Sequence, residues 1–374
     1  MTGARASFAR PSIAFLFVLL CAMAILATGC GEEDGDVTFP DPLEPVTGQW
    51  FLGVWGTGPD DVYVVGQPGL IFHWDGTDWT QQDSHTSEAL TDVWGDDAGN
   101  VYVTGHGGLV LRLQGDEWTT MDTGTEADLF NIGSFQDNIY ACGRNEDFAV
   151  LRRLDGGSWS EAPGEIFLRD NELAVTDTFY LHSDDDPEEI IESLATVGYF
   201  GIAGADGVIL MEDPETDWQL RRILGGEEWV KAAASSDRVS GNFIATSGGR
   251  LFHLVEGDGS QLSWEEVYSP ALDASIFGLY SDAADTVWAV TDDGRVNRVD
   301  PPYGNAVSLY NDGKALFDVW GSSGTNLYAV GIDGRVLHFH EVEGEHQWVE
   351  EILPLPDTKK DGTPAFDRFG DPIQ

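Results

Sequence analysis

Residues 50–79 read WFLGVWGTGPDDVYVVGQPGLIFHWDGTDW, and this stretch decides the fold. Residues 89–118, ALTDVWGDDAGNVYVTGHGGLVLRLQGDEW, repeat it, with Trp55 and Trp94 standing 39 residues apart. Residues 315–339, ALFDVWGSSGTNLYAVGIDGRVLHF, restore the same pattern near the end of the chain. A period of about 40 residues is typical of a repeat architecture built from four-stranded units.

The first unit predicts four short strands, at Phe51–Gly56, Val62–Gly66, Leu70–Trp74 and Trp79–Gln82. Aromatic and β-branched residues dominate these segments, and Gly, Asp, Asn and Pro fill the breaks between them. The turns between the second and third strands use pairs that accept the positive φ of tight hairpins. These turns are Gln67-Pro68-Gly69, Gly107-Gly108, Asp206-Gly207, Gly248-Gly249, Asp293-Gly294 and Asp333-Gly334.

The spacing of the later tryptophans gives the number of units. From Trp79 to Trp348 there are 269 residues, and the interval from Trp159 to Trp218 is about 20 residues longer than its neighbours. Without that insertion, six intervals of about 41 residues remain, and these bound seven units. Each sheet can bury both faces only against its neighbours, and radial closure protects the sheet edges. We therefore predict an all-β protein, a seven-bladed β-propeller of four-stranded antiparallel blades.

The predicted domain boundaries follow from the repeat. The propeller covers residues 49–353, with an insertion at 161–197 around blade four that contains the inner strand of that blade and a short helix. The Pro- and Asp-rich residues 354–374 are expected to form a loose tail.

The beginning of the chain predicts a lipoprotein signal peptide over residues 1–29. Two arginines precede an uncharged apolar run, and small residues come directly before Cys30. The stretch Leu26-Ala27-Thr28-Gly29-Cys30 resembles a bacterial lipobox, although Ala27 stands where the motif prefers Leu. The resemblance implies that Cys30 is lipidated and, with Gly31 after it, that the protein is held at the outer membrane. The acidic residues 30–48 would then be a tether. The alternative is an ordinary signal peptide with an incidental cysteine.

The composition excludes several classes of protein. The 374 residues carry 65 acidic and 19 basic side chains, a formal net charge of −46. Such a chain is a poor nucleic-acid ligand, because phosphate recognition depends on Lys and Arg. With 42% apolar residues it is also too hydrophobic for a disordered acidic protein. Loss of the signal peptide and lipidation of Cys30 would leave Cys142 as the one remaining thiol, so we expect no intrachain disulfide.

The unit V-W-G…D-V-Y-V-V-G…G-x-I-x-H-W-D-G-x-x-W resembles the WD-repeat/YVTN/BNR-like propellers common in bacterial surface lipoproteins. It is also similar to the photosystem II assembly-factor propeller. The resemblance covers roughly residues 50–350 and implies the fold. It implies no single function, because such propellers include enzymes and binding platforms.

The recurrent aromatic and histidine positions are interpreted as packing. A tryptophan recurs at one strand position in six units, and a packing role repeats with the repeat. His73, His253 and His338 share a third-strand position with Arg and Met in other units, which indicates a half-exposed column. Cys142 is expected to be a buried hydrophobe. The six tryptophans are Trp79, Trp118, Trp159, Trp218, Trp264 and Trp348.

Metal binding is left open at three places. His338 and His340 share a strand face and His346 lies just beyond them, so weak metal binding there is one interpretation. Asp184–Asp186 and Asp292-Asp293-Gly294 are the densest acidic runs and would suit calcium, although neither has EF-hand spacing. Solvated acidic loops are the alternative, and no other cofactor is predicted.

The predicted topology divides the charges between two faces of the disc. The loops between strands one and two and between three and four carry 23 acids, by our assignment, against a single arginine, Arg238. The opposite face carries the hairpin arginines Arg144, Arg250, Arg295 and Arg335, which we predict as docking-face residues. The alternative is a general acidity that serves solubility or a salty habitat.

We therefore expect a membrane-anchored, non-enzymatic propeller. It would be a monomer that binds an envelope protein or polysaccharide through one face and touches the membrane through its lipid alone. The alternative is a carbohydrate-active hydrolase or lyase with paired carboxylates at the propeller channel. A quinoprotein is disfavoured, because the repeat signature of that family is missing.

Overall fold

The alternation of buried and exposed residues in the repeats produces short strands whose sheets must stack. The computed structural model describes residues 49–354 with gaps at 97, 136–137, 145–148, 162–174, 181–199, 205–207, 214–216, 223–229, 235–242, 258–260, 268–273, 283–285 and 304. The predicted signal peptide, Cys30, the tether and residues 355–374 of the predicted tail lie outside the described residues. Within these ranges the chain forms seven four-stranded antiparallel sheets, each made of four consecutive strands.

The first three blades run from Trp50 to Glu161. Blade one is β1 (Trp50–Gly58), β2 (Asp61–Gln67), β3 (Leu70–Trp74) and β4 (Trp79–Gln82). Blade two is β5 (Leu90–Gly95), β6 (Val101–Gly105), β7 (Val110–Gln114) and β8 (Glu117–Met121). Blade three is β9 (Asp128–Phe135), β10 (Asn138–Arg144), β11 (Ala149–Asp155) and β12 (Ser158–Glu161).

The remaining sheets follow in chain order. Blade four is β13 (Val175–Tyr180), β14 (Phe200–Gly204), β15 (Val208–Asp213) and β16 (Asp217–Arg222). Blade five is β17 (Val230–Ala234), β18 (Phe243–Thr246), β19 (Leu251–Gly257) and β20 (Gln261–Val267). Blade six is β21 (Ile276–Ser281), β22 (Val287–Thr291), β23 (Arg295–Val299) and β24 (Ala306–Asn311). Blade seven is β25 (Leu316–Ser323), β26 (Asn326–Gly331), β27 (Arg335–Val342) and β28 (Glu345–Glu351).

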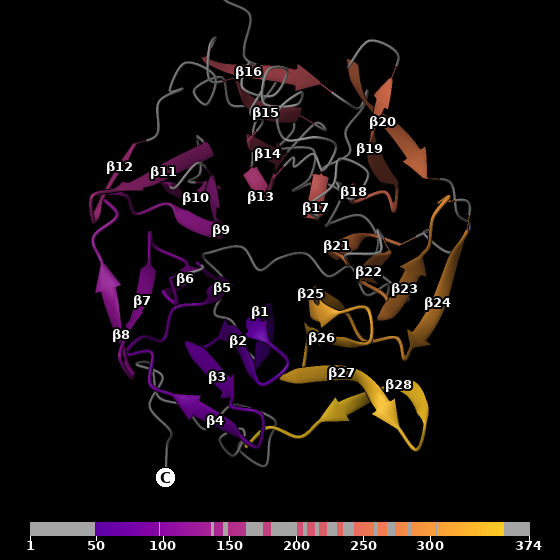
Figure 1. Ribbon diagram of the computed structural model, residues 1–374. Helices are drawn as coiled ribbons and strands as arrows, with labels where there is room; N and C mark the ends of the chain where they lie inside the picture. The colour runs from indigo at the N-terminus through magenta and orange to yellow at the C-terminus, as the bar shows by residue number, and fades with distance from the viewer. Residues whose placement is uncertain are drawn as a thin grey trace, which may run out of the picture. The chain divides into compact units, whose positions relative to one another are not determined.

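The first strand of each sheet lies at the inside of a ring (Figure 1). These inner strands contact one another in chain order, and β25 contacts β1. Blade seven comes from one continuous segment, so the ring closes by contact between blades seven and one. The predicted all-β propeller with four-stranded antiparallel blades is confirmed.

The prediction of seven blades needs one correction. Side chains that follow the repeat are described in six blades. For the fourth sheet the structure describes the backbone alone. In the fourth sheet β13 ends at Tyr180 and β14 begins at Phe200, so residues 181–199 interrupt the repeat between its first two strands. Only the backbone of β13–β16 is described, and the expected helix and the acidic run Asp184–Asp186 lie outside the described residues. Interblade side-chain packing is therefore established for six blades.

The hydrophobic core lies between the blades. Phe51, Val64 and Phe72 of blade one pack with Tyr328 and Val330 of blade seven in one buried cluster. Comparable clusters join blades one and two, two and three, five and six, and six and seven. The six blades whose side chains are described thus bury apolar residues against a neighbouring blade, as the repeat pattern predicts. No helix among the described residues is long and apolar enough to span a bilayer.

Candidate functional site

A β-bulge at the start of the inner strand places one extra side chain per blade at the ring. The register of β1 with β2 skips one residue between Phe51 and Gly53, and the inner strands of all the other sheets have the same break. A bulge re-aims a side chain and bends its strand. The bulged residues whose side chains are described are Leu52, Thr91, Phe130, Lys231, Phe277 and Phe317.

These bulged residues lie near the start of the inner strands, on the face of the ring that also carries the hairpins between second and third strands. The ring centroids of Trp50 and Phe317 lie 5.8 Å apart, and those of Phe317 and Phe277 are also separated by 5.8 Å. Lys231 Nζ stands 5.9 Å from the Phe277 ring, and Phe130 meets His106 edge-on at 6.5 Å. We call this set, with Trp50, the bulge rim.

The bulge rim combines apolar area with partial exposure. Trp50, Leu52, Phe130 and Phe277 are half-buried, and Phe317 is 5% exposed. Aromatic residues are enriched, and charged residues depleted, at the centres of protein interfaces. The sequence prediction missed this rim. The sequence does carry a sign of the bulge: two apolar residues in succession, such as Leu316 and Phe317, where the alternation of buried and exposed residues along a strand would place one.

The predicted docking arginines lie on the same face of the ring, and each described one is paired with a carboxylate. Arg250 binds Glu266 through two nitrogens, at 3.0 and 2.7 Å. Arg295 binds Asp293 at 2.9 and 2.7 Å. These pairs neutralise charge locally instead of presenting a free positive surface. The side chain of Arg144 lies outside the described residues.

Arg335 is the most buried of the three described docking arginines, with 3% of its surface exposed. It donates to Asp312 and to the Tyr310 hydroxyl at 2.7 Å. A cation this deeply buried serves the packing of blade seven against blade six. Lys314 is paired nearby with Asp333 at 3.1 Å.

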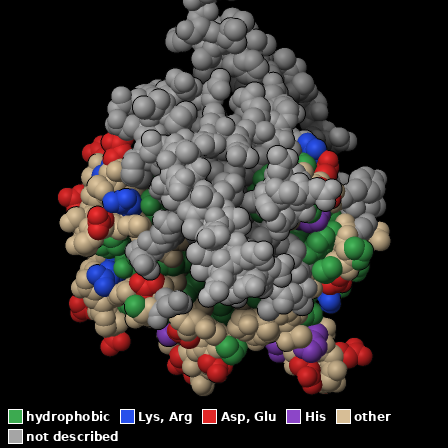
Figure 2. All heavy atoms as spheres, turned by 45° about the horizontal axis from the view of Figure 1, so that its top comes forward, with side chains coloured by type: hydrophobic (Ala, Val, Ile, Leu, Met, Phe, Trp, Pro, Cys, Tyr) green, Lys and Arg blue, Asp and Glu red, His purple; other side chains and the backbone are tan. Residues whose placement is uncertain are grey.

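Carboxylates on the opposite face are less well balanced. Among the described residues of this face, two acids have arginine partners, in the pairs Arg153–Asp155 and Arg298–Asp300. Figure 2 shows carboxylates spread along the outer edge of the described blades. Other acids of the loops on this face are exposed, and no Lys or Arg pair is described for them: Asp75, Asp78, Asp116, Glu117, Glu341, Glu343 and Glu345. The polarised disc stays a prediction.

Aspartates on two inner strands connect neighbouring blades. The Oδ2 atom of Asp318 accepts the backbone N–H of Val54 at 2.9 Å, across the seam between blades seven and one. Its Oδ1 accepts the N–H of Val319 at 2.8 Å. Burial raises the pKa of Asp318 to about 6. Asp92 accepts the equivalent backbone bonds from the N–H of Ile132 in blade three at 2.9 Å and from that of Val93 at 2.8 Å, and it also accepts a bond from the Asn131 side-chain amide at 2.9 Å.

This geometry makes Asp318 a structural acceptor. Both of its oxygens are used by backbone donors, and the described part of the chain brings no second buried carboxylate to face it. A glycosidase needs two such carboxylates at a defined separation. The hydrolase alternative therefore has no supporting pair among the described residues.

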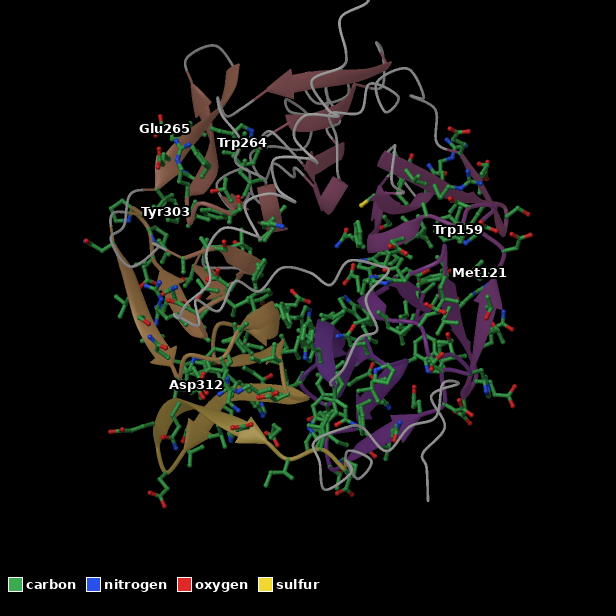
Figure 3. All side chains as sticks on the ribbon, turned by 180° about the vertical axis from the view of Figure 1, so that it is seen from behind. Met121, Trp159, Trp264, Glu265, Tyr303 and Asp312 are labelled. Carbon is green, nitrogen blue, oxygen red and sulfur yellow. The ribbon has the colours of Figure 1, made fainter. Side chains whose placement is uncertain are left out.

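The tryptophan column packs between blades, as predicted. Trp79 meets Tyr328 of the preceding blade edge-on at 6.1 Å, and Trp118 meets Tyr63 at 6.2 Å. Trp159 and Trp264 belong to outer strands on the two sides of the ring (Figure 3). Trp218 has no described side chain.

The histidine column has a common structural role. His73 stacks on Tyr63 at 4.3 Å, and His338 stacks on Tyr328 at 4.0 Å. Arg112 takes the same place over Tyr102 in blade two, at 5.7 Å. An imidazole or guanidinium over a second-strand aromatic explains why His and Arg alternate in the column. The predicted half-exposed column is confirmed.

The two remaining candidates in the sequence resolve differently. Cys142 is fully buried in β10, in agreement with a packing role. At the acidic run in blade six, burial disfavours charge on Asp293, but hydrogen bonds from Arg295 and Thr291 lower its pKa. Burial and the charge of Asp293 raise the pKa of Asp292. Because Asp293 already binds Arg295, the run does not present a free set of oxygen ligands.

Comparisons with solved structures support the fold alone. YCF48 from Cyanidioschyzon merolae matches with a TM-score of 0.57 and 15% identity, over 80% of this chain and 97% of that one. The WD40 β-propeller domain of Doa1 matches with a TM-score of 0.60 and 13% identity, over 80% and 95% of the two chains. A structure of YCF48 bound to D1 peptide has a TM-score of 0.57 and 12% identity, over 82% and 97%.

An enzyme shares the fold as well. Virginiamycin B lyase from Staphylococcus aureus matches with a TM-score of 0.53 and 11% identity, over 73% of this chain and 86% of that one. No protein-family model matches the sequence, and no curated protein matches it. The chain shares the β-propeller fold with all of these proteins.

Proposed function

We propose that this protein is a non-enzymatic propeller that binds a protein partner at the bulge rim. The observation that carries the proposal is the arc of aromatic residues from the half-buried Phe277 through the buried Phe317 to the half-buried Trp50. Large aromatic side chains near the centre of a contact supply most of the binding energy in protein interfaces. The carboxylate-paired arginines beside the rim reduce the desolvation cost that free charges would add.

The comparisons agree with this proposal at the level of the fold. One solved propeller of similar backbone, YCF48, is bound to a peptide. The opposite face of the present protein carries many exposed carboxylates and would repel an acidic partner. A partner segment with apolar side chains therefore suits the bulge rim better than it suits the other face.

The test compares a rim variant with a matched surface variant. Phe130→Ser and Phe277→Ser together should abolish capture, by chemical cross-linking in envelope extract, of the partner that the wild-type protein captures. Val307→Ser and Leu309→Ser remove comparable apolar side chains, 53% and 42% exposed, from an outer strand of blade six. This control should capture the same partner. Capture that survives the rim substitutions, in variants with an unchanged circular dichroism spectrum, would contradict the proposal.

We further propose that a lipid on Cys30 holds the propeller at the outer membrane. The support is the apolar run that ends in small residues and a cysteine, followed by Gly31. Cys30→Ser should move the protein from the membrane fraction to the soluble fraction after cell lysis. Cys142→Ser, which alters the buried thiol, should leave it with the membranes. A Cys30→Ser protein that stays with the membrane fraction would rule out the anchor.

A further inference from the structure

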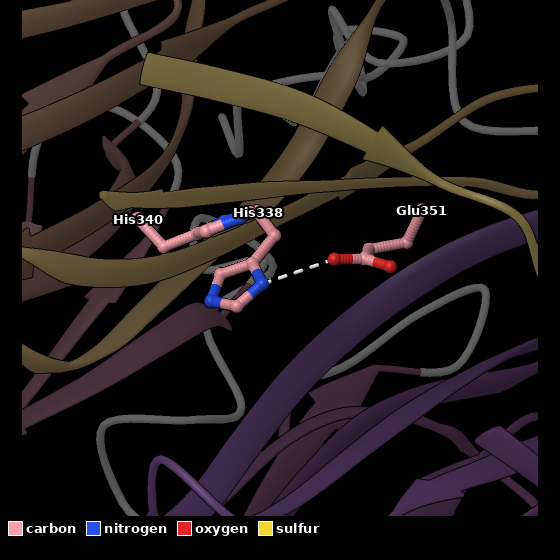
Figure 4. A group of neighbouring side chains, drawn as sticks. All are labelled: His338, His340 and Glu351. Atoms are coloured by element: carbon pink, nitrogen blue, oxygen red, sulfur yellow. Dashed lines mark hydrogen bonds and ion pairs between the residues drawn. The ribbon is translucent and has the colours of Figure 1, made fainter. Parts of the chain in front are cut away.

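Three metal-ligating side chains meet on blade seven. His338 and His340 are two residues apart on β27, so both point to the same face of the sheet. Glu351 lies on the neighbouring strand β28 (Figure 4). The candidate ligand atoms of the three residues all lie within 4.8 Å of one another, and all three side chains are half-buried.

The hydrogen bonds of this cluster leave one group unsatisfied. His338 Nδ1 lies 3.0 Å from Glu351 Oε1, and His338 Nε2 lies 3.2 Å from Asn326 Nδ2. His340 Nδ1 is buried and has no hydrogen-bond partner in the described structure. A buried polar atom without a partner is costly and calls for an explanation.

The cluster breaks the symmetry of the repeat. Two residues beyond the histidine column, the position of His340 is taken in other described blades by Asp75, Gln114, Asp155, Val255 and Asp300. The fourth-strand position of Glu351, set by its pairing with the third strand, is taken by Gln82, Met121, Val267 and Tyr310. The second imidazole and the carboxylate therefore occur together in blade seven and in no other blade whose side chains are described. A packing role would repeat with the blades, whereas a ligand site need not.

We propose that His338, His340 and Glu351 bind one divalent transition-metal ion, with Zn²⁺ as the best fit. Two imidazoles and one carboxylate are an established three-residue zinc set that leaves a fourth position for water. Zn–N and Zn–O bonds of about 2.0–2.2 Å need the ligand atoms somewhat closer together than they are now, which small side-chain rotations supply. His338 would use Nδ1, exchanging its bond to Glu351 for the metal.

Neighbouring residues support the orientation of the ligands. The Tyr328 ring lies against His338 at 4.0 Å and fixes the plane of its imidazole. Asn326 Nδ2 lies 3.2 Å from Nε2. A ring that binds metal through Nδ1 carries its proton on Nε2, so the Asn326 amide would turn over to accept that N–H with its oxygen, as outer partners of ligating histidines commonly do. His346, which the sequence placed near this site, is exposed, lies against Phe339 at 5.7 Å, and is not part of the cluster.

The experiment is a titration of the chelator-treated full chain with Zn²⁺ by calorimetry, and with Co²⁺ by its ligand-field absorption. We expect one ion per chain and the intense absorption of a low-coordinate site. His340→Gln and Glu351→Gln should each weaken binding at least about tenfold, a loss that even outer-partner changes can produce. His85→Gln and His346→Gln alter exposed histidines outside the cluster and should bind as the wild type does.

A thermal measurement separates a lost ligand from a lost fold. A fixed Zn²⁺ concentration a few times the wild-type Kd should raise the Tm of the wild type and of the two control variants, and should raise that of His340→Gln clearly less. A His340→Gln protein that is folded without metal and still binds one Zn²⁺ with wild-type affinity would overturn the proposal. So would a wild-type protein that shows no saturable site for Zn²⁺ or Co²⁺.

Discussion

Asp318, at the contact between blades seven and one, makes the free energy of unfolding depend on pH. Its pKa of about 6 in the folded protein lies above its ordinary value of 3.8, because burial disfavours the charged carboxylate. Between these two values the folded state holds more protons than the unfolded state, so this group's contribution to the free energy of unfolding falls as pH rises. The contribution is complete below about pH 4 and is lost as pH passes through about 6.

Asp318→Asn should remove this pH dependence. The free energy of unfolding of the wild type, relative to the variant, should fall by about 3 kcal/mol between pH 4 and pH 7, since each pKa unit corresponds to about 1.4 kcal/mol. Urea unfolding at a series of pH values measures the difference. The same comparison with Glu341→Gln, which alters an exposed carboxylate, should show a much smaller slope. A difference between wild type and Asp318→Asn that is flat across this range would contradict the interpretation.

At the level of the strand, glycine sets how closely the inner strands approach. A Cβ on Gly53 would lie 2.9 Å from the Asp92 Cα atom of the next blade, and one on Gly278 would lie 2.7 Å from the Asp318 Cα atom. The first residue of each pair is a glycine because the backbone of the neighbouring blade stands opposite it. The two aspartates opposite these glycines accept backbone N–H groups of the next inner strand: Asp92 from Ile132, and Asp318 from Val54.

Gly53→Ala should destabilise the protein by about 1–3 kcal/mol, because the methyl group must push two backbones apart. Gly58→Ala is a matched control on the same strand, since a Cβ there meets nothing within 4 Å. The midpoint and slope of urea unfolding for the two variants measure the effect. Equal midpoints would show that the inner strands can separate without cost.

The strands themselves could be predicted because their signals are local. The third and fourth strands of blade one begin and end where the sequence placed them, at Leu70–Trp74 and Trp79–Gln82. The bulge rim could not, because the alternation rule assigns one side chain per face and a bulge adds an extra one. The partners of Arg335 were also missed, since Asp312 and Tyr310 belong to the preceding blade and become neighbours only in the ring.

The site in blade seven shows the same limit. The sequence placed His338 and His340 on one strand face, and it named His346 as the third neighbour. The structure brings Glu351 into the cluster instead, through the pairing of β27 with β28. Strand register decides which distant side chain joins a pair, and the register became visible only with the sheet.

For the whole molecule, the net charge of −46 sets a self-repulsion that folding must overcome. On the described part of the face opposite the bulge rim, carboxylates outnumber their cationic partners. Because these carboxylates are exposed, the repulsion between them acts mainly through solvent. Repulsion between exposed charges is screened by salt, and the Debye length shortens from about 30 Å at 0.01 M to about 10 Å at 0.1 M. Salt should therefore stabilise the folded ring.

Raising the sodium chloride concentration from about 0.01 M to about 0.1 M should increase the Tm, because screening over this range weakens the repulsion between carboxylates on different blades. Differential scanning calorimetry at pH 7 measures the change. Potassium chloride should have the same effect, because screening depends on ionic strength and not on the identity of the monovalent cation. A Tm that is unchanged or lower would mean that pairs such as Arg250–Glu266 and Arg295–Asp293 contribute more to stability than the unpaired carboxylates remove. A rise confined to one cation would instead indicate a specific ion site on the disc.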